Sequence, residues 1–197
     1  LPICAYPALR EAFRGYLHED WTTEYADSED AARAFRRDAA DDQAKAVAAD
    51  LGDEAVRTRA IDAINAAFGA PDILVNAAAN NIRKPLPALS DDDIRATLAL
   101  NLEAPLALIR ALTPAMQAKG WGRIVAITSE SWRAGVPMGI AAYAASKAGV
   151  VGFVRQLAAE TGRKGITVNA LSLGTMNNWE GSDAVARPAS GGPTLAR

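Results

Sequence analysis

The sequence holds a single cysteine, Cys4, and a single histidine, His18. Within one chain this excludes a disulfide framework, a zinc site built from Cys and His, and a Cys-x-x-Cys redox pair. A Ser-His-acid triad could use only His18, which lies in an acidic, aromatic stretch far from any serine motif. We therefore expect no metal site and a reducing, cytoplasmic setting.

Net charge and long apolar runs are also lacking. Lys plus Arg number 21 and Asp plus Glu number 23, so the formal net charge is −2 and gives no reason to expect nucleic acid or an anionic membrane as a partner. No apolar run approaches the roughly 18 residues of a membrane span, and residues 1–10 lack the pattern of a signal peptide. Half of the 197 residues are apolar, which is enough for one domain with a sizeable core.

Short apolar runs alternate with helical patterns between residues 45 and 176. Near-continuous apolar runs of this length suit strands that are buried on both faces. These runs lie at 46–49, 73–76, 123–128 and 166–171. Helices are expected at 53–68, 91–118 and 143–161, with Gly69 and Gly162 as stop signals. The alternation indicates an α/β domain with a parallel sheet.

The segments on either side of this core read differently. Residues 1–44 form an atypical N-terminal segment, in which 29–44 has the composition of a polar helix. Residues 177–197 are rich in Gly, Pro and Ser, and we expect an irregular tail.

Tyr143 and Lys147 form the most informative motif, Tyr-Ala-Ala-Ser-Lys. On a helix, side chains at i and i+4 share a face, and an ammonium group beside a phenol favours the phenolate. Such a tyrosine can exchange a proton with a substrate oxygen. Taken alone, a chance pair on a solvated helix face is the more common explanation, so the surroundings decide.

Polar or small residues stand where the predicted strands end. Ser129 directly follows the run RIVAIT and precedes the tyrosine by 143 − 129 = 14 residues. Asn76 ends the run ILVN before three alanines, and Asp50 and Leu51 follow the first run. Ligands of open parallel sheets bind at the carboxyl ends of the strands, so we expect a site there.

Six motifs follow one another over residues 45–176. They are AADL (48–51), ILVNAAA (73–79), Asn101 in LALNLEAP, GRIVAITS (122–129), YAASKAGVVGF (143–153) and GITVNALSLG (165–174). This combination resembles the short-chain dehydrogenase/reductase family. The resemblance implies a doubly wound Rossmann fold of three α/β/α layers. It also implies hydride transfer between NAD or NADP and a small-molecule alcohol or carbonyl substrate, in a homo-oligomer (a dimer or tetramer).

The resemblance also implies roles for individual residues. Tyr143 would be the general acid and base, and Lys147 would hold the nicotinamide ribose and favour the phenolate. Ser129 would hydrogen-bond the substrate oxygen, with Ser131 as a rival for this role. Asn101 would help to anchor a water-linked proton relay through Lys147.

Cofactor contacts follow from the same resemblance. Asp50 and Leu51 would contact the adenine, and Asn76, Ala77 and Ala78 would line the ribose side. Gly174 to Met176 would lie near the nicotinamide.

The sequence departs from the family pattern at its ends. Family members begin with a strand and a glycine-rich turn of the form T-G-x-x-x-G-x-G, whereas the only glycine here before Gly52 is Gly15. No second strand ends in the residue that would choose between NAD and NADP. The family's Asn-Asn-Ala-Gly appears as Asn76 to Ala79, and if Ala79 needs a positive φ the change costs about 1 kcal/mol. We therefore expect a family core with atypical or truncated ends.

Two functions remain open at this point. One is an NAD(P)-dependent oxidoreductase; the other is an inactive fragment or pseudoenzyme that retains only the core and the oligomer-forming helices. Segment 80–85, NNIRKP, is similar to that of sugar-acid or polyol dehydrogenases, which indicates such a substrate. Trp121 and Trp132 fit either a pocket wall or ordinary packing.

Two further signals concern helix 91–118. The acids at 91–93 follow Ser90 and fit a helix cap better than a set of metal ligands, because acids in a first turn satisfy free N–H groups. Pro105 and Pro114 would normally break a helix. The family tolerates prolines here, so we expect the helix to be whole but kinked.

Overall fold

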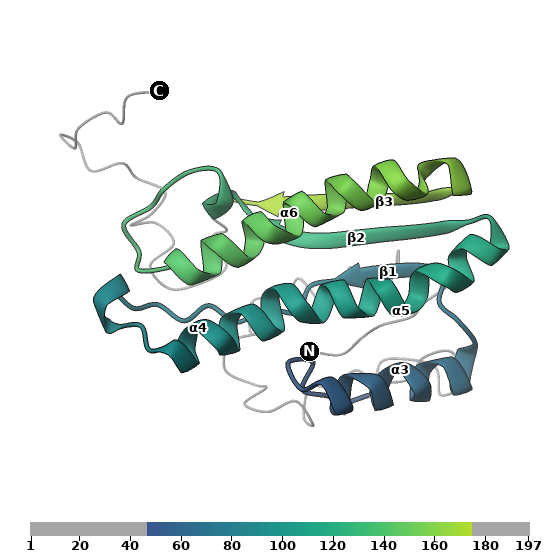
Figure 1. The fold of residues 1–197 in the computed structure, drawn as a ribbon, viewed down its shortest axis with the longest axis horizontal. Helices are drawn as coiled ribbons and strands as arrows, with labels where there is room; N and C mark the ends of the chain where they lie inside the picture. The colour runs from purple at the N-terminus through teal and green to yellow at the C-terminus, as the bar shows by residue number, and fades with distance from the viewer. Residues whose placement is uncertain (1–46, 175–197) are drawn as a thin grey trace, which may run out of the picture.

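The computed structural model describes residues 47–174 (Figure 1). The predictions for residues 1–44 and 177–197 lie outside this range. The helices are α3 (Glu54–Phe68), α4 (Asp91–Leu98), α5 (Ala104–Lys119) and α6 (Ala141–Thr161). The strands are β1 (Ile73–Asn76), β2 (Gly122–Ser129) and β3 (Ile166–Leu173), and short helical turns lie at Leu86–Ala88, Glu130–Trp132 and Gly162–Lys164. The predicted α/β alternation is confirmed in this range.

Strands β1, β2 and β3 form one parallel sheet in that order. Ser129 at the end of β2 pairs with Leu173 of β3, whereas β1 ends earlier, with Asn76 opposite Ala126. The three carboxyl ends therefore share one edge of the sheet, where α4 and α6 also begin (Figure 1). This edge is termed the carboxyl edge below, and the opposite one the amino edge.

The predicted strand at 46–49 is wrong for the residues that the structure describes. Residues 47–50 have no regular secondary structure, and Ala48 is exposed. A strand needs a neighbour for its ladder of backbone hydrogen bonds. Within residues 47–174 the only neighbour of β1 is β2, so no strand is present for this segment to join.

Helices α5 and α6 pack on one face of the sheet, and α3 packs beside α5 (Figure 1). Leu74, Ile124 and Val168 are neighbours in register and are buried in the core on this face. The sequence predicted strands that are buried on both faces, but the other face of the sheet is partly open. Residues of β2 alternate between buried and half-buried, and Leu171 of β3 is 52% exposed. No helix among the described residues packs extensively on that face, which explains the alternation.

One continuous helix runs from Asp91 to Lys119, with a π-helical turn at Ala99–Glu103 between α4 and α5. Pro105 has no N–H, so the Asn101 carbonyl, four residues earlier, lacks its α-helical donor. The π turn accommodates this missing hydrogen bond, and in it the Ala104 N–H donates to the Ala99 carbonyl five residues back. The helix is whole as predicted, with a π turn at this place.

By length and composition alone, this helix could also cross a membrane. Core helices pass the same test, and this one supplies Leu108, Ile109, Leu112 and Met116 to the hydrophobic core. We therefore assign it to the core. Pro114 is exposed, so water can reach the carbonyl that the proline leaves without a helical donor.

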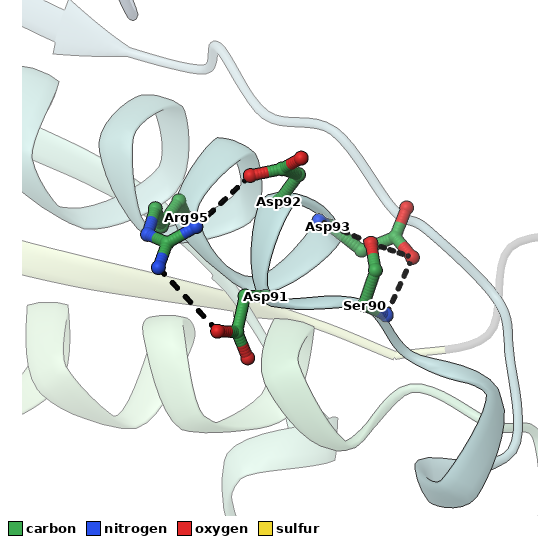
Figure 2. Close-up of polar contacts among 5 residues, drawn as sticks. All are labelled: Ser90, Asp91, Asp92, Asp93 and Arg95. Carbon is green, nitrogen blue, oxygen red and sulfur yellow. Dashed lines mark hydrogen bonds and ion pairs between the residues drawn. The ribbon is translucent and has the colours of Figure 1, made fainter.

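Ser90 and Asp93 cap the start of α4, as predicted (Figure 2). The Asp93 N–H donates to Ser90 Oγ at 3.1 Å, and the Ser90 N–H donates to Asp93 Oδ2 at 2.9 Å. The two acids before Asp93 pair with Arg95 instead. Lys84, whose Nζ lies 2.7 Å from Asp93 Oδ2, and then Ser90 lower the pKa of Asp93 from 3.8 to about 2. In the described range no cluster of three His, Cys, Asp or Glu side chains could hold a metal ion.

Candidate active site at the carboxyl edge

Tyr143 and Lys147 lie in the first turns of α6, which begins at the carboxyl edge (Figure 1). Lys147 Nζ is 5.7 Å from the centroid of the Tyr143 ring. Lys147 is only 3% exposed, and its Nζ donates to the Ile127 carbonyl of β2 at 2.9 Å. Lys147 is therefore buried and Tyr143 is half-buried, so the pair does not lie on a solvated helix face.

The ammonium group of Lys147 is poorly compensated. Burial lowers the pKa of Lys147 below its usual value of 10.5. No carboxylate among residues 47–174 forms an ion pair with it. A backbone carbonyl and an aromatic ring compensate only part of the cost of burying a charge. A buried lysine whose pKa is shifted, near the carboxyl end of a strand, is typical of a functional site.

Asn101 connects the loop after β1 to α6. It is 1% exposed, in the π turn. Its Oδ1 accepts from the Asn80 N–H at 2.8 Å, while its Nδ2 donates to the Asn80 carbonyl at 2.9 Å and to Ser146 Oγ at 3.2 Å. The Ser146 hydroxyl donates in turn to the Tyr143 carbonyl at 2.7 Å. The predicted residue Asn101 is thus joined to the predicted Tyr143 through two hydrogen bonds.

Ser146 and Asn80 take part in this network, but sequence reasoning missed both as site residues. The signal for Ser146 was available, because it stands three residues after Tyr143 and directly before Lys147 on the same helix. Asn80 had no such local signal. Its bonds to Asn101 join the loop after β1 to the π turn, 21 residues further along the chain.

Ser129 ends β2, where the prediction expected it. Its Oγ accepts from the Ser131 N–H at 3.2 Å, so its own hydroxyl hydrogen is still available to a ligand. The rival Ser131 has a buried Oγ without a hydrogen-bond partner. Lys147 binds the same strand two residues before Ser129, which connects this serine to the Tyr143–Lys147 pair.

The predicted cofactor residues do not all lie at the carboxyl edge. Asn76 is buried and Ala77 is exposed at the end of β1, and Gly174 follows β3, so all three lie at the carboxyl edge. Asp50 is exposed and its Oδ1 accepts from the Gly52 N–H at 2.9 Å. Ala78 and Leu51 belong to the core cluster.

Two further details concern this set. The Leu51 carbonyl accepts from Arg57 Nη1 at 2.6 Å, so that oxygen is already engaged. No non-glycine residue within 47–174 has a positive φ, so Ala79 carries none of the strain that the sequence left open. Met176 lies outside the described residues.

Trp121 and Trp132 stand at opposite ends of β2. Trp121 precedes the strand at the amino edge and packs its ring 4.4 Å from the Arg123 guanidinium carbon. Trp132 follows the strand at the carboxyl edge and donates its indole N–H to Ser172 Oγ of β3 at 2.8 Å. Of the two, only Trp132 lies at the edge that holds the candidate site.

A family model described as short chain dehydrogenase matches residues 12–183 of this sequence. The chain belongs to the short-chain dehydrogenase family. A subunit of (2S)-[(R)-hydroxy(phenyl)methyl]succinyl-CoA dehydrogenase, BbsD of Thauera aromatica, is 39% identical over 134 residues, which cover 67% of this chain and 53% of that protein. D-threitol dehydrogenase of Mycolicibacterium smegmatis is 40% identical over 125 residues, which cover 64% of this chain and 48% of that protein.

Among solved structures, this chain is similar to 4-hydroxyisoleucine dehydrogenase complexed with NADH. The TM-score is 0.62 and the sequence identity 33%, over 65% of this chain and 56% of that chain. The likeness confirms the predicted Rossmann-type α/β fold. The family match is wider than the core of 45–176 that the motifs define, and the chain spans about half the length of the curated relatives it matches.

Proposed function

We propose that this chain acts as an NAD(P)-dependent oxidoreductase that interconverts an alcohol and a carbonyl compound. The observation that carries the proposal is the environment of Lys147. Its buried ammonium group has no carboxylate partner among the described residues, lies beside the Tyr143 ring and is bonded to β2 just before Ser129. A lysine that served stability alone would have its charge neutralised or exposed.

The carboxyl edge fits the nicotinamide half of such a cofactor. Ala77 at the end of β1 is small and exposed, so the cofactor's ribose can approach the backbone there. Lys147 Nζ would hold the ribose hydroxyls, and Gly174 adds no side chain beyond β3. The sequence contains no glycine-rich turn for the pyrophosphate, so the fit rests on the nicotinamide half.

When bound, the nicotinamide accepts or supplies the hydride. In the oxidative direction, Tyr143 as a phenolate takes the proton of the substrate hydroxyl. Ser129 donates a hydrogen bond to the same oxygen, because its Oγ already accepts from Ser131 and keeps its own hydrogen. Lys147 stabilises the phenolate by its charge. A water on the Asn101 carbonyl, which Pro105 leaves without an α-helical donor, would carry the proton onward from Lys147.

For the substrate we propose a polyol or a sugar acid. Support comes from segment 80–85, whose sequence is similar to that of dehydrogenases of these compounds, and from the relative named for D-threitol. A second candidate function is a non-catalytic protein that pairs with copies of itself through the outer faces of α5 and α6. The absence of a glycine-rich turn from the sequence favours this alternative.

Replacement of Tyr143 by Phe tests the proposed chemistry. We expect kcat with a polyol and NAD(P)⁺ to fall by about 10²- to 10⁴-fold, because the general acid–base group is gone. The dissociation constant for NADH, followed by its fluorescence, should change less than about twofold, since Tyr143→Phe keeps the ring. Unchanged turnover would remove Tyr143 from this role. No saturable NADH binding to the wild type at millimolar concentration would favour the non-catalytic alternative.

A pair of serine variants separates the two rivals. Ser129→Ala should lower kcat by about 10- to 100-fold, because one donor to the substrate oxygen is lost. Ser131→Ala should leave kcat within about threefold, since the Ser131 N–H that Ser129 uses is a backbone group. The reverse order of effects would assign the role to Ser131. Steady-state kinetics of both variants at saturating cofactor give the answer.

A further inference from the structure

Trp132 combines exposure with a fixed orientation. Its side chain is among the large hydrophobic groups that the described surface exposes, at 37%. The indole N–H donates to Ser172 Oγ at 2.8 Å, and Ser172 Oγ is itself 3.0 Å from Thr128 Oγ1. The half-buried Ser172 and the buried Thr128, on two neighbouring strands, thus hold an aromatic ring that the core does not need. This arrangement orients a flat apolar surface toward solvent or a ligand.

The ring stands next to the candidate active site. Trp132 closes the short turn that begins directly after Ser129, and this turn packs on α6, which carries Tyr143. The loops after β1 and β2 are also joined, because the Lys84 N–H donates to the Gly139 carbonyl at 2.9 Å. The segments that follow β1 and β2 therefore flank one region at the carboxyl edge.

Two unsatisfied polar atoms lie in the same region. Asn80 Oδ1 and Ser131 Oγ are the buried side-chain atoms that lack a hydrogen-bond partner within residues 47–174. The Asn80 amide has a defined orientation, because its Nδ2 donates to the Ala96 carbonyl at 3.3 Å, where an oxygen would be repelled. Its Oδ1 is then a pure acceptor, and it is closed off from solvent. Buried atoms without partners are rare and cluster at functional sites.

We propose that the substrate is a cyclic polyol, a ring with at least two neighbouring hydroxyl groups, and that Trp132 is the platform on which the ring lies. One hydroxyl is the reacting group at Ser129 and Tyr143. The apolar face of the ring contacts the indole. The inference rests on the proposed oxidoreductase function and narrows its substrate from polyols in general to ring-shaped ones.

A matched pair of tryptophan variants and a matched pair of diols test this. Trp132→Ala should lower kcat/KM for cis-cyclohexane-1,2-diol about threefold to tenfold more than for meso-butane-2,3-diol, because only the first has a ring to stack. Trp132→Phe should restore most of the loss. Trp121→Ala, at the other end of β2, should change neither substrate.

Equal losses for ring and open-chain diols, or no loss for either, would overturn the platform while leaving the oxidoreductase function in place. The two proposals also separate in a direct binding measurement. If the wild type turned over no alcohol, ring binding would be followed by quenching of tryptophan fluorescence without cofactor. Quenching by the cyclic diol that disappears in Trp132→Phe and persists in Trp121→Phe supports the platform, and quenching that is equal in both variants overturns it.

Discussion

The two ends of β2 are built differently. At the amino edge, charged groups are paired: Lys119 Nζ lies 2.6 Å from Asp72 Oδ1 and 3.1 Å from the Ala70 carbonyl, and Arg123 donates to the Gly165 carbonyl at 3.1 Å. At the carboxyl edge, Lys147 is buried without a carboxylate partner among the described residues, and two polar atoms have no partner there at all. The sheet thus keeps stabilising interactions at one edge and unsatisfied groups at the other.

This division follows from the geometry of a parallel sheet. The strand ends and helix starts at the carboxyl edge converge on one region, which suits a ligand. At the amino edge the chain only turns from a helix into the next strand. Unsatisfied groups cost stability until a ligand supplies partners. Substitutions at the two edges should therefore affect different properties, activity at one and stability at the other.

The largest effect should come from Lys147→Met, which removes the poorly compensated charge. We expect kcat to fall by about 100-fold or more, because the phenolate of Tyr143 loses its ammonium neighbour. The free energy of unfolding at pH 7 should be higher for Lys147→Met than for the wild type. Burial lowers the pKa of Lys147 in the folded protein below its unfolded value of 10.5. The cost in stability of burying the ammonium charge is therefore complete below the folded-state pKa, and it falls as the pH rises from that pKa toward 10.5. Urea unfolding at pH 7 and pH 9.5 should therefore show the stability gap between variant and wild type narrowing; a less stable Met variant would contradict the contrast.

At the amino edge, Gly165→Ala should lower the free energy of unfolding by about 2–4 kcal/mol with little effect on the residues of the site. Gly165 has φ +76°, and a Cβ there would collide with the Gly120 carbonyl oxygen, which is backbone and cannot step aside. Gly162→Ala is the matched control, since its φ is −55° and a Cβ there meets nothing within 4 Å. Urea titrations of both variants measure the difference. Equal stability of the two would show that the amino edge is looser than the structure indicates.

The smallest effect concerns the capped start of α4, where the carboxyl edge does contain a satisfied charge. The pKa of Asp93 is lowered to about 2 by Lys84 and Ser90, so the stabilisation is present above the unfolded value of 3.8 and is lost as the pH falls through about 2. Asp93→Asn should therefore be less stable than the wild type at pH 7 and equal to it near pH 2. Asp91→Asn, at a more exposed ion pair, should show a smaller gap at pH 7. A gap for Asp93→Asn that does not change with pH would rule out this charge effect.

The sequence predicted the local elements well because their signals are local. The helical periods, the Ser90 cap and the Gly69 and Gly162 stops depend on residues within a few positions of one another. The strands predicted at β1, β2 and β3 were right because each of them has a parallel neighbour in the sheet. The strand at 46–49 was wrong for the opposite reason. A strand depends on a partner far along the chain, and composition does not reveal whether that partner is in place.

The candidate site was predicted in part. The i, i+4 spacing gave Tyr143 and Lys147, and family resemblance gave Asn101 and Ser129. The spacing did not show that Lys147 would be buried against Ile127, which requires α6 to lie on β2. The link from Asn80 through Asn101 to Ser146 joins three distant segments and has no sequence period. These contacts arise only from packing.

The π turn at Ala99–Glu103 determines where this helix tolerates a change in length. The wide turn holds one residue more than an α-helical turn, so loss of Ala99 would close it to α geometry and leave α4 in place. Loss of a residue inside α4 would instead rotate everything before it by about 100°. The Ser90 cap and the side chain of Asn101 could then not both keep their present positions, and either Lys84 or Ser146 would lose its partner. Evolution can exchange side chains here, but a deletion inside α4 would dismantle these contacts without touching Tyr143, Lys147 or Ser129.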